Sequence, residues 1–399
     1  MDVELRDLLR ISHGLGRDHK LVQGGGGNTS VKTPDGRMYV KASGVTLKDL
    51  DEGKGYRAVD LGACLAILED EALGKLPAAA REAEMTKRLA ASCVDELAGR
   101  PSVETCLHAL LGRCVAHTHP SILGGFLCAN GGREATRRLY GEIRPPYLCL
   151  EYVDFGYALA ARMREEVLAY RRRHGEPPRI VFIENHGLFV SADGAEEALA
   201  LTQDIVGRAS AAWETRRHTE SRRKAPQYSA QDRARLEAEV KRELERVYGG
   251  IFGERAVVRT KTGGTVADFF EHSGCEELAR EGPLTPDAIA YCRGTPVWVS
   301  AEERERMGDL AALAVRAREA GGRTPACVLV DGLALFSAGR STRTAENVEE
   351  TLEAVLEMLM IASSFGGVRG LSSQAALYVW QSEVVAYRRG LTAREGGKG

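Results

Sequence analysis

Three histidines at the ends of apolar segments are the residues of this chain best suited to chemistry. His117 and His119 close the run Arg-Cys-Val-Ala-His-Thr-His-Pro, and His186 closes the run Ile-Val-Phe-Ile-Glu-Asn-His. An extended strand turns alternate side chains to one face, so the first two imidazoles should point the same way. Three neutral imidazoles that meet from two strand ends can hold a zinc-like ion with one position open for substrate. Taken singly, each histidine could equally be a hydrogen-bonded core residue.

A carboxylate precedes the histidine pair. Residues 101–111 are expected to form a helix with Ser102 as its N-cap and Glu104 in its first turn, where the helix dipole favours an ionised side chain. Beside a metal-polarised carbonyl, such a carboxylate is suited to removing a proton from the adjacent carbon. Without the histidines, stabilisation of the helix end would be the simpler interpretation of Glu104.

A glycine-rich turn and a few small polar residues could bind an anion. Consecutive glycines at 24–27 let backbone N–H groups converge without obstruction by Cβ atoms. A glycine cluster on its own is more often a flexible turn. The candidate phosphate-binding residues are Gly27, Asn28, Thr29, Ser43, Gly44 and Ser102. The turn is not a dinucleotide fingerprint, because Thr29 stands where the third glycine is required, and this disfavours a nicotinamide oxidoreductase.

Bulk composition excludes several classes of function. The 399 residues carry 54 basic and 56 acidic side chains, so a dominant basic surface for nucleic acid is not expected. There is no apolar run long enough to span a bilayer, and the first residues do not resemble a signal peptide. None of the nine cysteines forms a Cys-x-x-Cys pair. We therefore expect a cytoplasmic protein with reduced, buried thiols, in which Cys114 packs in the core rather than binding metal.

The pattern of the chain predicts alternating helices and strands in two parts. Residues 1–215 are expected to form the metal-binding domain, 216–250 a charged helical linker, and 251–399 a C-terminal α/β domain. The linker is interpreted as a solvated segment. The expected helices are 3–16, about 81–98, 101–111 and a long one ending near 213, and the expected strands are 30–32, 37–41, 113–119 and 180–185.

A weak internal similarity links the two parts. The segment 186–192, His-Gly-Leu-Phe-Val-Ser-Ala, can be aligned with 332–338, Gly-Leu-Ala-Leu-Phe-Ser-Ala. An apolar strand comes before each segment and a long helix follows each. Asp331-Gly332 then stand where Asn185-His186 stand, so a second copy would lack the metal ligand. The C-terminal part is therefore a candidate degenerate repeat that is structural or shapes substrate access, unless the similarity arose by chance.

As an ordered set, these motifs resemble the class II aldolase/adducin family. The set comprises Gly-Gly-Asn-Thr-Ser, Lys41-Ala-Ser-Gly44, Pro101-Ser-Val-Glu104, His117-Thr-His119-Pro and Glu184-Asn-His-Gly187. The resemblance covers roughly residues 20–215. It is greatest to the aldolase portion of bacterial bifunctional rhamnulose-1-phosphate aldolase/dehydrogenases. Residues 280–380 of this chain also resemble the C-terminal extension of that branch.

The resemblance implies an αβα sandwich with a mainly antiparallel central sheet, in a zinc-dependent enzyme of phosphorylated sugars. Another divalent metal could replace zinc. The implied ligands are His117, His119 and His186, with Glu104 as acid and base. The implied reaction is reversible cleavage of a ketose 1-phosphate to dihydroxyacetone phosphate and an aldehyde, in a homo-oligomer. The family's serine pair before the glutamate is Ser102-Val103 here, which removes one phosphate donor.

Two other functions remain open at this stage. An epimerase or dehydratase of the same family would use the same metal and base, and only product analysis separates it from an aldolase. A non-catalytic, adducin-like scaffold should lack the metal ligands, yet all three histidines and Glu104 are present.

Overall fold

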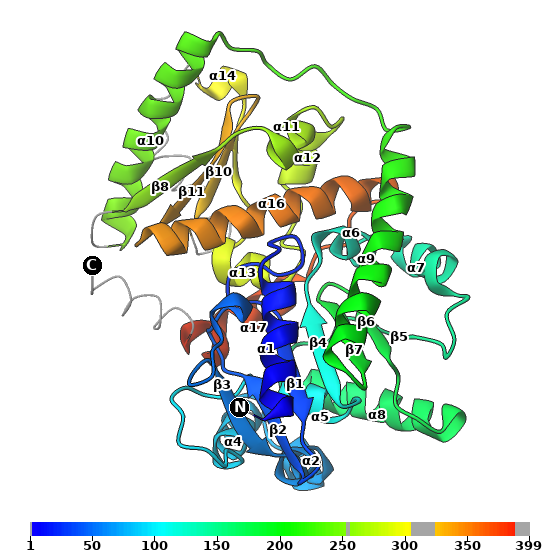
Figure 1. Cartoon of the computed structure of the whole chain (residues 1–399). Helices are drawn as coiled ribbons and strands as arrows, with labels where there is room; N and C mark the ends of the chain where they lie inside the picture. Colours follow the sequence, from blue (N-terminus) through cyan, green and yellow to red (C-terminus); the bar gives the residue numbers. More distant parts are fainter. Residues whose placement is uncertain (1, 253–255, 305–323, 388–399) are drawn as a thin grey trace. The chain divides into compact units, whose positions relative to one another are not determined.

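The protein is described by a computed structural model that covers residues 2–252, 256–304 and 324–387 (Figure 1). Parts of the expected C-terminal domain, 305–323 and 388–399, lie outside the described residues. Contacts divide the chain into two compact units, the first made of 1–127 with 136–210 and the second of 128–135 with 211–399. The expected boundaries at 215 and 250 stay a prediction. Among the described helices, none is both long and apolar enough to cross a membrane.

The first unit is built on a seven-stranded sheet in the order β3-β2-β1-β4-β7-β6-β5. All neighbouring strands are antiparallel except β5 and β6. The expected mainly antiparallel sheet is therefore confirmed. The strands are β1 (Asn28–Lys32), β2 (Arg37–Lys41), β3 (Tyr56–Asp60), β4 (Cys114–Thr118), β5 (Leu148–Leu150), β6 (Ile180–Ile183) and β7 (Gly187–Ala192).

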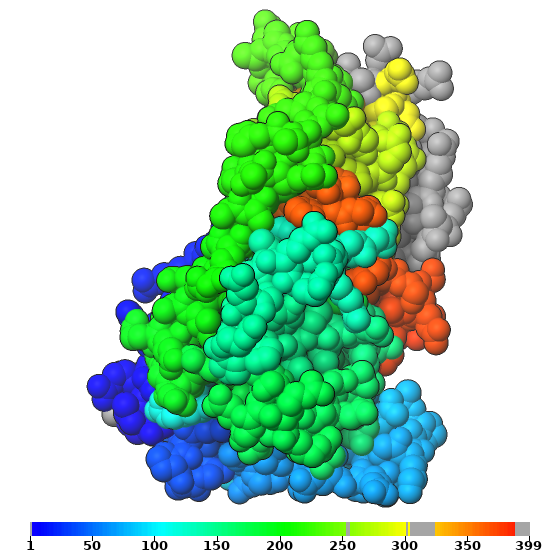
Figure 2. All heavy atoms as spheres, turned by 90° about the vertical axis from the view of Figure 1, so that its right-hand side faces the viewer, coloured from blue at the N-terminus to red at the C-terminus, as the bar shows by residue number. Residues whose placement is uncertain are grey.

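Helices cover both faces of this sheet, which gives the expected three layers (Figure 1). The helices that precede β8 in the sequence are α1 (Val3–Gly16), η1 (Leu47–Asp49), α2 (Leu61–Glu69), α3 (Glu71–Gly74), α4 (Ala78–Ala91), α5 (Thr105–Ala109), α6 (Ser121–Leu127), α7 (Gly132–Tyr140), α8 (Tyr157–His174), α9 (Ala195–Arg217) and α10 (Ala230–Phe252). The last of them, α10, belongs to the second unit. The end of α8 lies at the surface, in green in Figure 2, and its run Arg171-Arg172-Arg173 is exposed as the sequence suggested.

The sequence of α1 shows how one layer forms. Asp2 caps the helix by accepting the N–H of Leu5 at 2.8 Å. The apolar residues Leu8, Ile11 and Leu15 recur at helical spacing and are buried. They join the same cluster as Val31 of β1 and the first turns of α9. The opposite face of β1 is thus left free to meet α5.

The second unit carries a four-stranded sheet in the order β8-β11-β10-β9. Its strands are β8 (Val257–Lys261), β9 (Val297–Val299), β10 (Cys327–Val330) and β11 (Ala334–Gly339), and its further described helices are α11 (Gly264–Phe270), α12 (Cys275–Ala279), α13 (Pro286–Cys292), α14 (Ala301–Arg304), α16 (Thr342–Ser364) and α17 (Ser373–Gln381). Segment 128–135 belongs to this unit because Asn130 and Gly131 donate backbone hydrogen bonds to Gly367 and Phe365, both at 2.9 Å.

The interpretation of 216–250 as a solvated linker needs correction at α10. One face of this helix carries the charged residues, but Val240, Leu244 and Tyr248 on the other face are buried. They pack in one cluster with Val258 of β8 and Phe336 of β11. Helix α10 is therefore part of the core of the second unit.

The second sheet repeats the topology of half of the first. The orders β4-β7-β6-β5 and β8-β11-β10-β9 both end in one parallel pair that follows two antiparallel pairs. The hairpin turns match as well. Glu184 donates its N–H to Leu150 at 3.0 Å, and Asp331 donates to Val299 at the same distance.

This correspondence corrects the register of the repeat by one residue. Asn185 and Gly332 are the left-handed residues of the two turns, with φ of 53° and 66°. Consequently Leu333, and not Gly332, occupies the position of His186. The shift also places Leu-Phe at 188–189 opposite Leu-Phe at 335–336. The expectation that the second copy lacks this ligand is unaffected, because leucine cannot coordinate a metal.

Candidate active site

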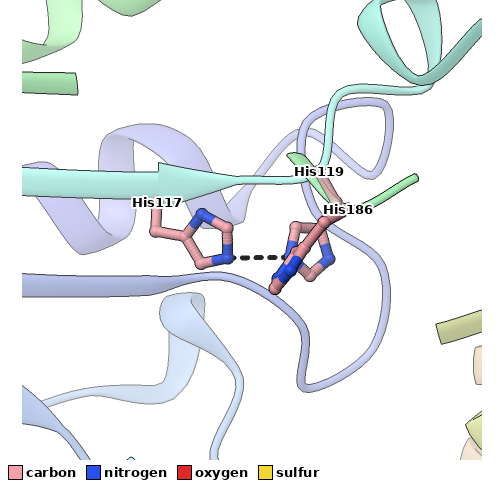
Figure 3. A group of neighbouring side chains, drawn as sticks. All are labelled: His117, His119 and His186. Atoms are coloured by element: carbon pink, nitrogen blue, oxygen red, sulfur yellow. Dashed lines mark hydrogen bonds between the residues drawn. The ribbon is translucent and has the colours of Figure 1, made fainter. Parts of the chain in front are cut away.

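The histidines meet at the ends of three neighbouring strands. His117 lies within β4, His119 lies one residue beyond it, and His186 ends the turn between β6 and β7. Antiparallel pairing of β4 with β7 sets Thr118 opposite Leu188, which brings the two histidine segments together. One ring nitrogen from each histidine lies within 4.8 Å of the others. Figure 3 shows the three rings gathered at the end of the β4 arrow.

Hydrogen bonding fixes the ring orientation of His117. Its Nδ1 lies 3.0 Å from the carbonyl oxygen of Leu188, which can only accept, so Nδ1 carries the proton. The Nε2 atom then presents its lone pair to the cluster, 3.0 Å from Nε2 of His119 (dashed in Figure 3). The ring of His117 also stacks on Phe189 with centroids 3.9 Å apart. In metal-binding histidines, the ring nitrogen that does not bind the metal commonly donates its N–H to a backbone carbonyl in this way.

Close backbone packing makes this convergence possible. A Cβ atom on Gly187 would lie 2.5 Å from the carbonyl oxygen of Thr118 and 2.8 Å from Cδ2 of His119. A Cβ atom on Gly27 would lie 2.8 Å from the carbonyl oxygen of His117. Side chains at either glycine would therefore push the histidine segment out of position.

Glu104 lies beside the histidines, but not in the predicted helical position. Helix α5 is only Thr105–Ala109, and Glu104 is the residue before its first turn, so the expected helix 101–111 was too long at both ends. The Ser102 hydroxyl does accept the N–H of Glu104, at 3.2 Å. Oε1 of Glu104 lies 3.0 Å from Nε2 of His186 and 3.5 Å from Nε2 of His117.

The electrostatic surroundings keep Glu104 ionised. The side chain is buried, and burial by itself raises the pKa of a carboxyl group. When the imidazoles of His117 and His186 are protonated, their positive charge and hydrogen bonds outweigh this effect and hold the pKa of Glu104 well below its ordinary value. A buried carboxylate is thus available next to the histidine cluster.

The structure gathers some of the candidate phosphate-binding residues and turns one away. Ser43 and Ser102 lie on adjacent loops, because Ala42 bridges Pro101 and the N–H of Ser43 donates to Arg100 at 2.8 Å. Gly44 has a φ of 83°, Gly27 one of 65°, and the turn at 24–27 directly precedes β1. The Thr29 hydroxyl, however, bonds to Ser12 of α1 at 2.6 Å on the opposite face of the sheet.

Two lysines near the site had no role assigned from the sequence, although Lys41 belongs to one of the motifs. Lys41 is fully buried at the end of β2, and its Nζ donates to the carbonyl oxygens of Gly25 and Val45, at 3.1 and 2.6 Å. It thereby ties the glycine turn to the loop that holds Ser43. Lys32 donates to three carbonyl oxygens that follow or end α5. The available signal was a lysine as the last residue of two of the expected strands.

Cys114 confirms the core interpretation. It is fully buried on the α1 side of β4, in the cluster opposite to the face that carries His117. All nine cysteines are free thiols in the structure.

Comparison with known proteins identifies the family. The sequence model described as "Class II Aldolase and Adducin N-terminal domain" matches residues 6–213, just over half of the chain. The chain belongs to the class II aldolase and adducin family. Class II aldolases typically use a divalent metal, and the cluster of His117, His119 and His186 is a donor set of that kind.

Two individual relatives are each less than 30% identical to this chain. An "uncharacterized oxidoreductase YuxG" of Bacillus subtilis (strain 168) is 29% identical over 214 residues, which are 51% of this chain and 29% of that protein. The chain thus spans less than a third of the length of this curated relative. The N-terminal class II aldolase domain of a conserved Thermoplasma acidophilum protein is 26% identical with a TM-score of 0.44, covering 53% of this chain and 95% of that one.

A further solved structure is the l-fuculose-1-phosphate aldolase of Thermus thermophilus. It is 18% identical with a TM-score of 0.34, covering 54% of this chain and 97% of that one. The family assignment rests on the sequence model and not on these structural scores.

Proposed function

We propose that this class II aldolase/adducin family member is a metal-dependent aldolase that reversibly cleaves a ketose 1-phosphate to dihydroxyacetone phosphate and an aldehyde. The observation that carries the proposal is a buried carboxylate, Glu104, within 3.0–3.5 Å of two members of a three-histidine cluster. A metal centre paired with a proton-transfer group is what enolate chemistry next to a carbonyl requires.

The residues present fit a divalent cation, and we favour Zn²⁺. His117, His119 and His186 would hold it, since their ring nitrogens converge and the tautomer of His117 is set by Leu188. When bound there, such a cation supplies Lewis-acid polarisation of a substrate carbonyl and its neighbouring hydroxyl. Glu104 lies close enough to His117 and His186 to act on a substrate bound at the same place.

Glu104 would carry the proton in both directions. In cleavage, the carboxylate of Glu104 would take the proton of the hydroxyl on the fourth substrate carbon as the bond between the third and fourth carbons breaks, so that the aldehyde leaves and the dihydroxyacetone phosphate fragment retains the electron pair as an enediolate. Glu104 then delivers a proton to the third carbon. In condensation, the same carboxylate removes that proton. Burial of Glu104 excludes water that would otherwise compete for this transfer.

The phosphate group would lie against the loops that carry Ser43, Gly44 and Ser102, beside the glycine turn that ends at Gly27. These loops offer backbone N–H groups and hydroxyls, and Lys41 between them adds a buried amino group. A rhamnulose-1-phosphate-like substrate, a homo-oligomeric state and a cytoplasmic location complete the proposal, on the basis of the sequence resemblance.

Product identity tests the proposal. Metal-replete protein is incubated with dihydroxyacetone phosphate and a panel of aldehydes, and the products are identified by mass spectrometry. An aldolase yields condensation products that carry the carbon atoms of both reactants. A single isomerised or dehydrated product from a ketose phosphate would instead indicate an epimerase or dehydratase, and no turnover with any metal would contradict the proposal.

A further inference from the structure

The two carboxylate oxygens of Glu104 have different partners. Oε1 faces the histidine cluster, 3.0 Å from Nε2 of His186. Oε2 instead accepts a hydrogen bond from the side-chain amide of Asn28, a buried residue at the start of β1. The carboxylate plane is therefore defined at both ends, with one oxygen toward the metal ligands and the other held by the sheet.

Strand register places the Asn28 amide with little freedom. Asn28 stands directly opposite His117 in the antiparallel pairing of β1 with β4. Two residues along the same face of β1, the Ser30 hydroxyl lies 2.8 Å from Nδ1 of His108. Glu104 and His108 are one helical turn apart, so two neighbouring side chains of β1 hold two neighbouring side chains at α5.

We infer that Asn28 is a positioning residue for Glu104, which rests on the proposed function of this site. Its amide fixes the rotation of the carboxylate so that Oε1 stays directed at the substrate position near the histidines. A carboxylate free to rotate would spend much of its time out of proton-transfer geometry, and small misplacements of a reacting group reduce rates strongly. This role differs from the phosphate contact that the sequence predicts for Asn28.

The two roles make different predictions for Asn28→Ala. A positioning role predicts that exchange of the transferable proton of dihydroxyacetone phosphate with D₂O slows about 10- to 100-fold, the usual cost of removing a group that orients a site residue. The KM for dihydroxyacetone phosphate, inhibition by inorganic phosphate and the zinc content should stay unchanged. A phosphate contact predicts weaker binding of both phosphate compounds with little change in the maximal exchange rate.

Ser30→Ala is the matched control. It removes the neighbouring contact between β1 and α5 without touching Glu104, so it should lower the thermal midpoint yet leave proton exchange close to wild type. Asn28→Ser is measured alongside in case Asn28→Ala does not fold. The double variant Asn28→Ala/Glu104→Gln should exchange no more slowly than Glu104→Gln alone, because the amide acts only through the carboxylate.

A second readout does not depend on turnover. In metal-free protein labelled with ¹⁵N-asparagine, the Asn28 side-chain signals, assigned by their loss in Asn28→Ala, should shift in Glu104→Gln. Unshifted signals, an unaffected exchange rate in the folded Asn28 variants, or a loss confined to phosphate affinity would each overturn the inference. If the wild-type protein catalyses no exchange at all, it is the proposed function that fails, and the NMR result still decides the contact.

Discussion

At the scale of single residues, the site depends as much on glycines as on ligands. Three imidazoles can converge only if the backbone that carries them is closely packed, and Gly187 lies where β7 meets the end of β4. Its absent side chain leaves room for the Thr118 carbonyl and the His119 ring. The motif Asn-His-Gly therefore contains a candidate ligand, His186, and a glycine whose missing side chain leaves room for the other candidate ligands.

Gly187→Ala should weaken zinc binding at least about tenfold while most of the fold is retained, because displaced ligands cost metal affinity much as lost orienting groups do. Isothermal titration with Zn²⁺ checks this. Gly207→Ala is the control, since a Cβ atom there meets nothing within 4 Å and alanine favours the helix. Equal zinc affinity in the Gly187 variant and the wild type would show that the strand ends can separate without loss of the site.

At the scale of secondary structure, β1 is the element that organises the site. One face carries Thr29 and Val31 into the packing with α1, and the other carries Asn28 and Ser30 toward α5. The alternation of a strand thus separates residues that are adjacent in sequence. Thr29 and Asn28 are adjacent in the sequence and both are candidate phosphate-binding residues, but their side chains have different surroundings.

Lys32, at the end of β1, should be a major contributor to the stability of this arrangement. Its Nζ donates to the carbonyl oxygens of His108, Leu111 and Gly112 at 2.6–2.9 Å. Lys32→Met would leave these acceptors without that donor and should lower the free energy of unfolding by about 2 kcal/mol. Urea denaturation measures the change, with exposed Lys48→Met as the control. Equal losses in the two variants would contradict a specific role.

The contact between α1 and β2 predicts a loss of stability at high pH. Burial, together with the hydrogen bond that Tyr39 donates to Asp2 at 2.7 Å, raises the pKa of Tyr39 to about 12. Because this folded-state pKa exceeds the ordinary value of 10, the contribution is complete below pH 10 and is lost as the pH rises from 10 toward 12. Thermal midpoints should therefore fall less steeply over this window in Tyr39→Phe. Tyr387→Phe, in the second unit, controls for the loss of a phenol, and parallel curves for all three proteins would refute the assignment.

At the scale of the whole molecule, two units share half a sheet topology but not the candidate site. The hairpin of the second unit has Leu333 at the position of His186. Its turn is covered by the segment before α10: a Cβ atom on Gly332 would lie 2.5 Å from the carbonyl oxygen of Pro226, and Tyr228 donates to the Asp331 carbonyl at 3.0 Å. The corresponding turn in the first unit holds a candidate metal ligand instead.

Metal binding should therefore stabilise one unit and not the other. All three candidate ligands belong to the first unit, so saturating Zn²⁺ should raise its free energy of unfolding by about 2.7 kcal/mol at one hundred times Kd. In calorimetry, one of two unfolding transitions should shift upward with zinc and return with a chelator. His186→Ala should abolish the shift. Equal shifts of both transitions would indicate that the units unfold together.

The candidate metal ligands, the neighbouring carboxylate and most of the elements that carry them could be predicted from the order of residues alone. The spacing of the histidines, the carboxylate before them and the apolar runs that end at them are local features, and local features persist in the linear order of residues. Helix α1 agrees with its predicted bounds, and β2 does as well, because amphipathic spacing and a Pro-Asp-Gly turn are encoded over a few residues.

The order of residues does not show which side chains share a face or which residues pack between distant segments; the folded structure does. The opposite directions of Asn28 and Thr29 and the packing of α10 depend on partners 17 to 100 residues away in the chain. Pairing between strands fixes such relations through hydrogen bonds and excluded volume, and neither is visible in the order of residues alone.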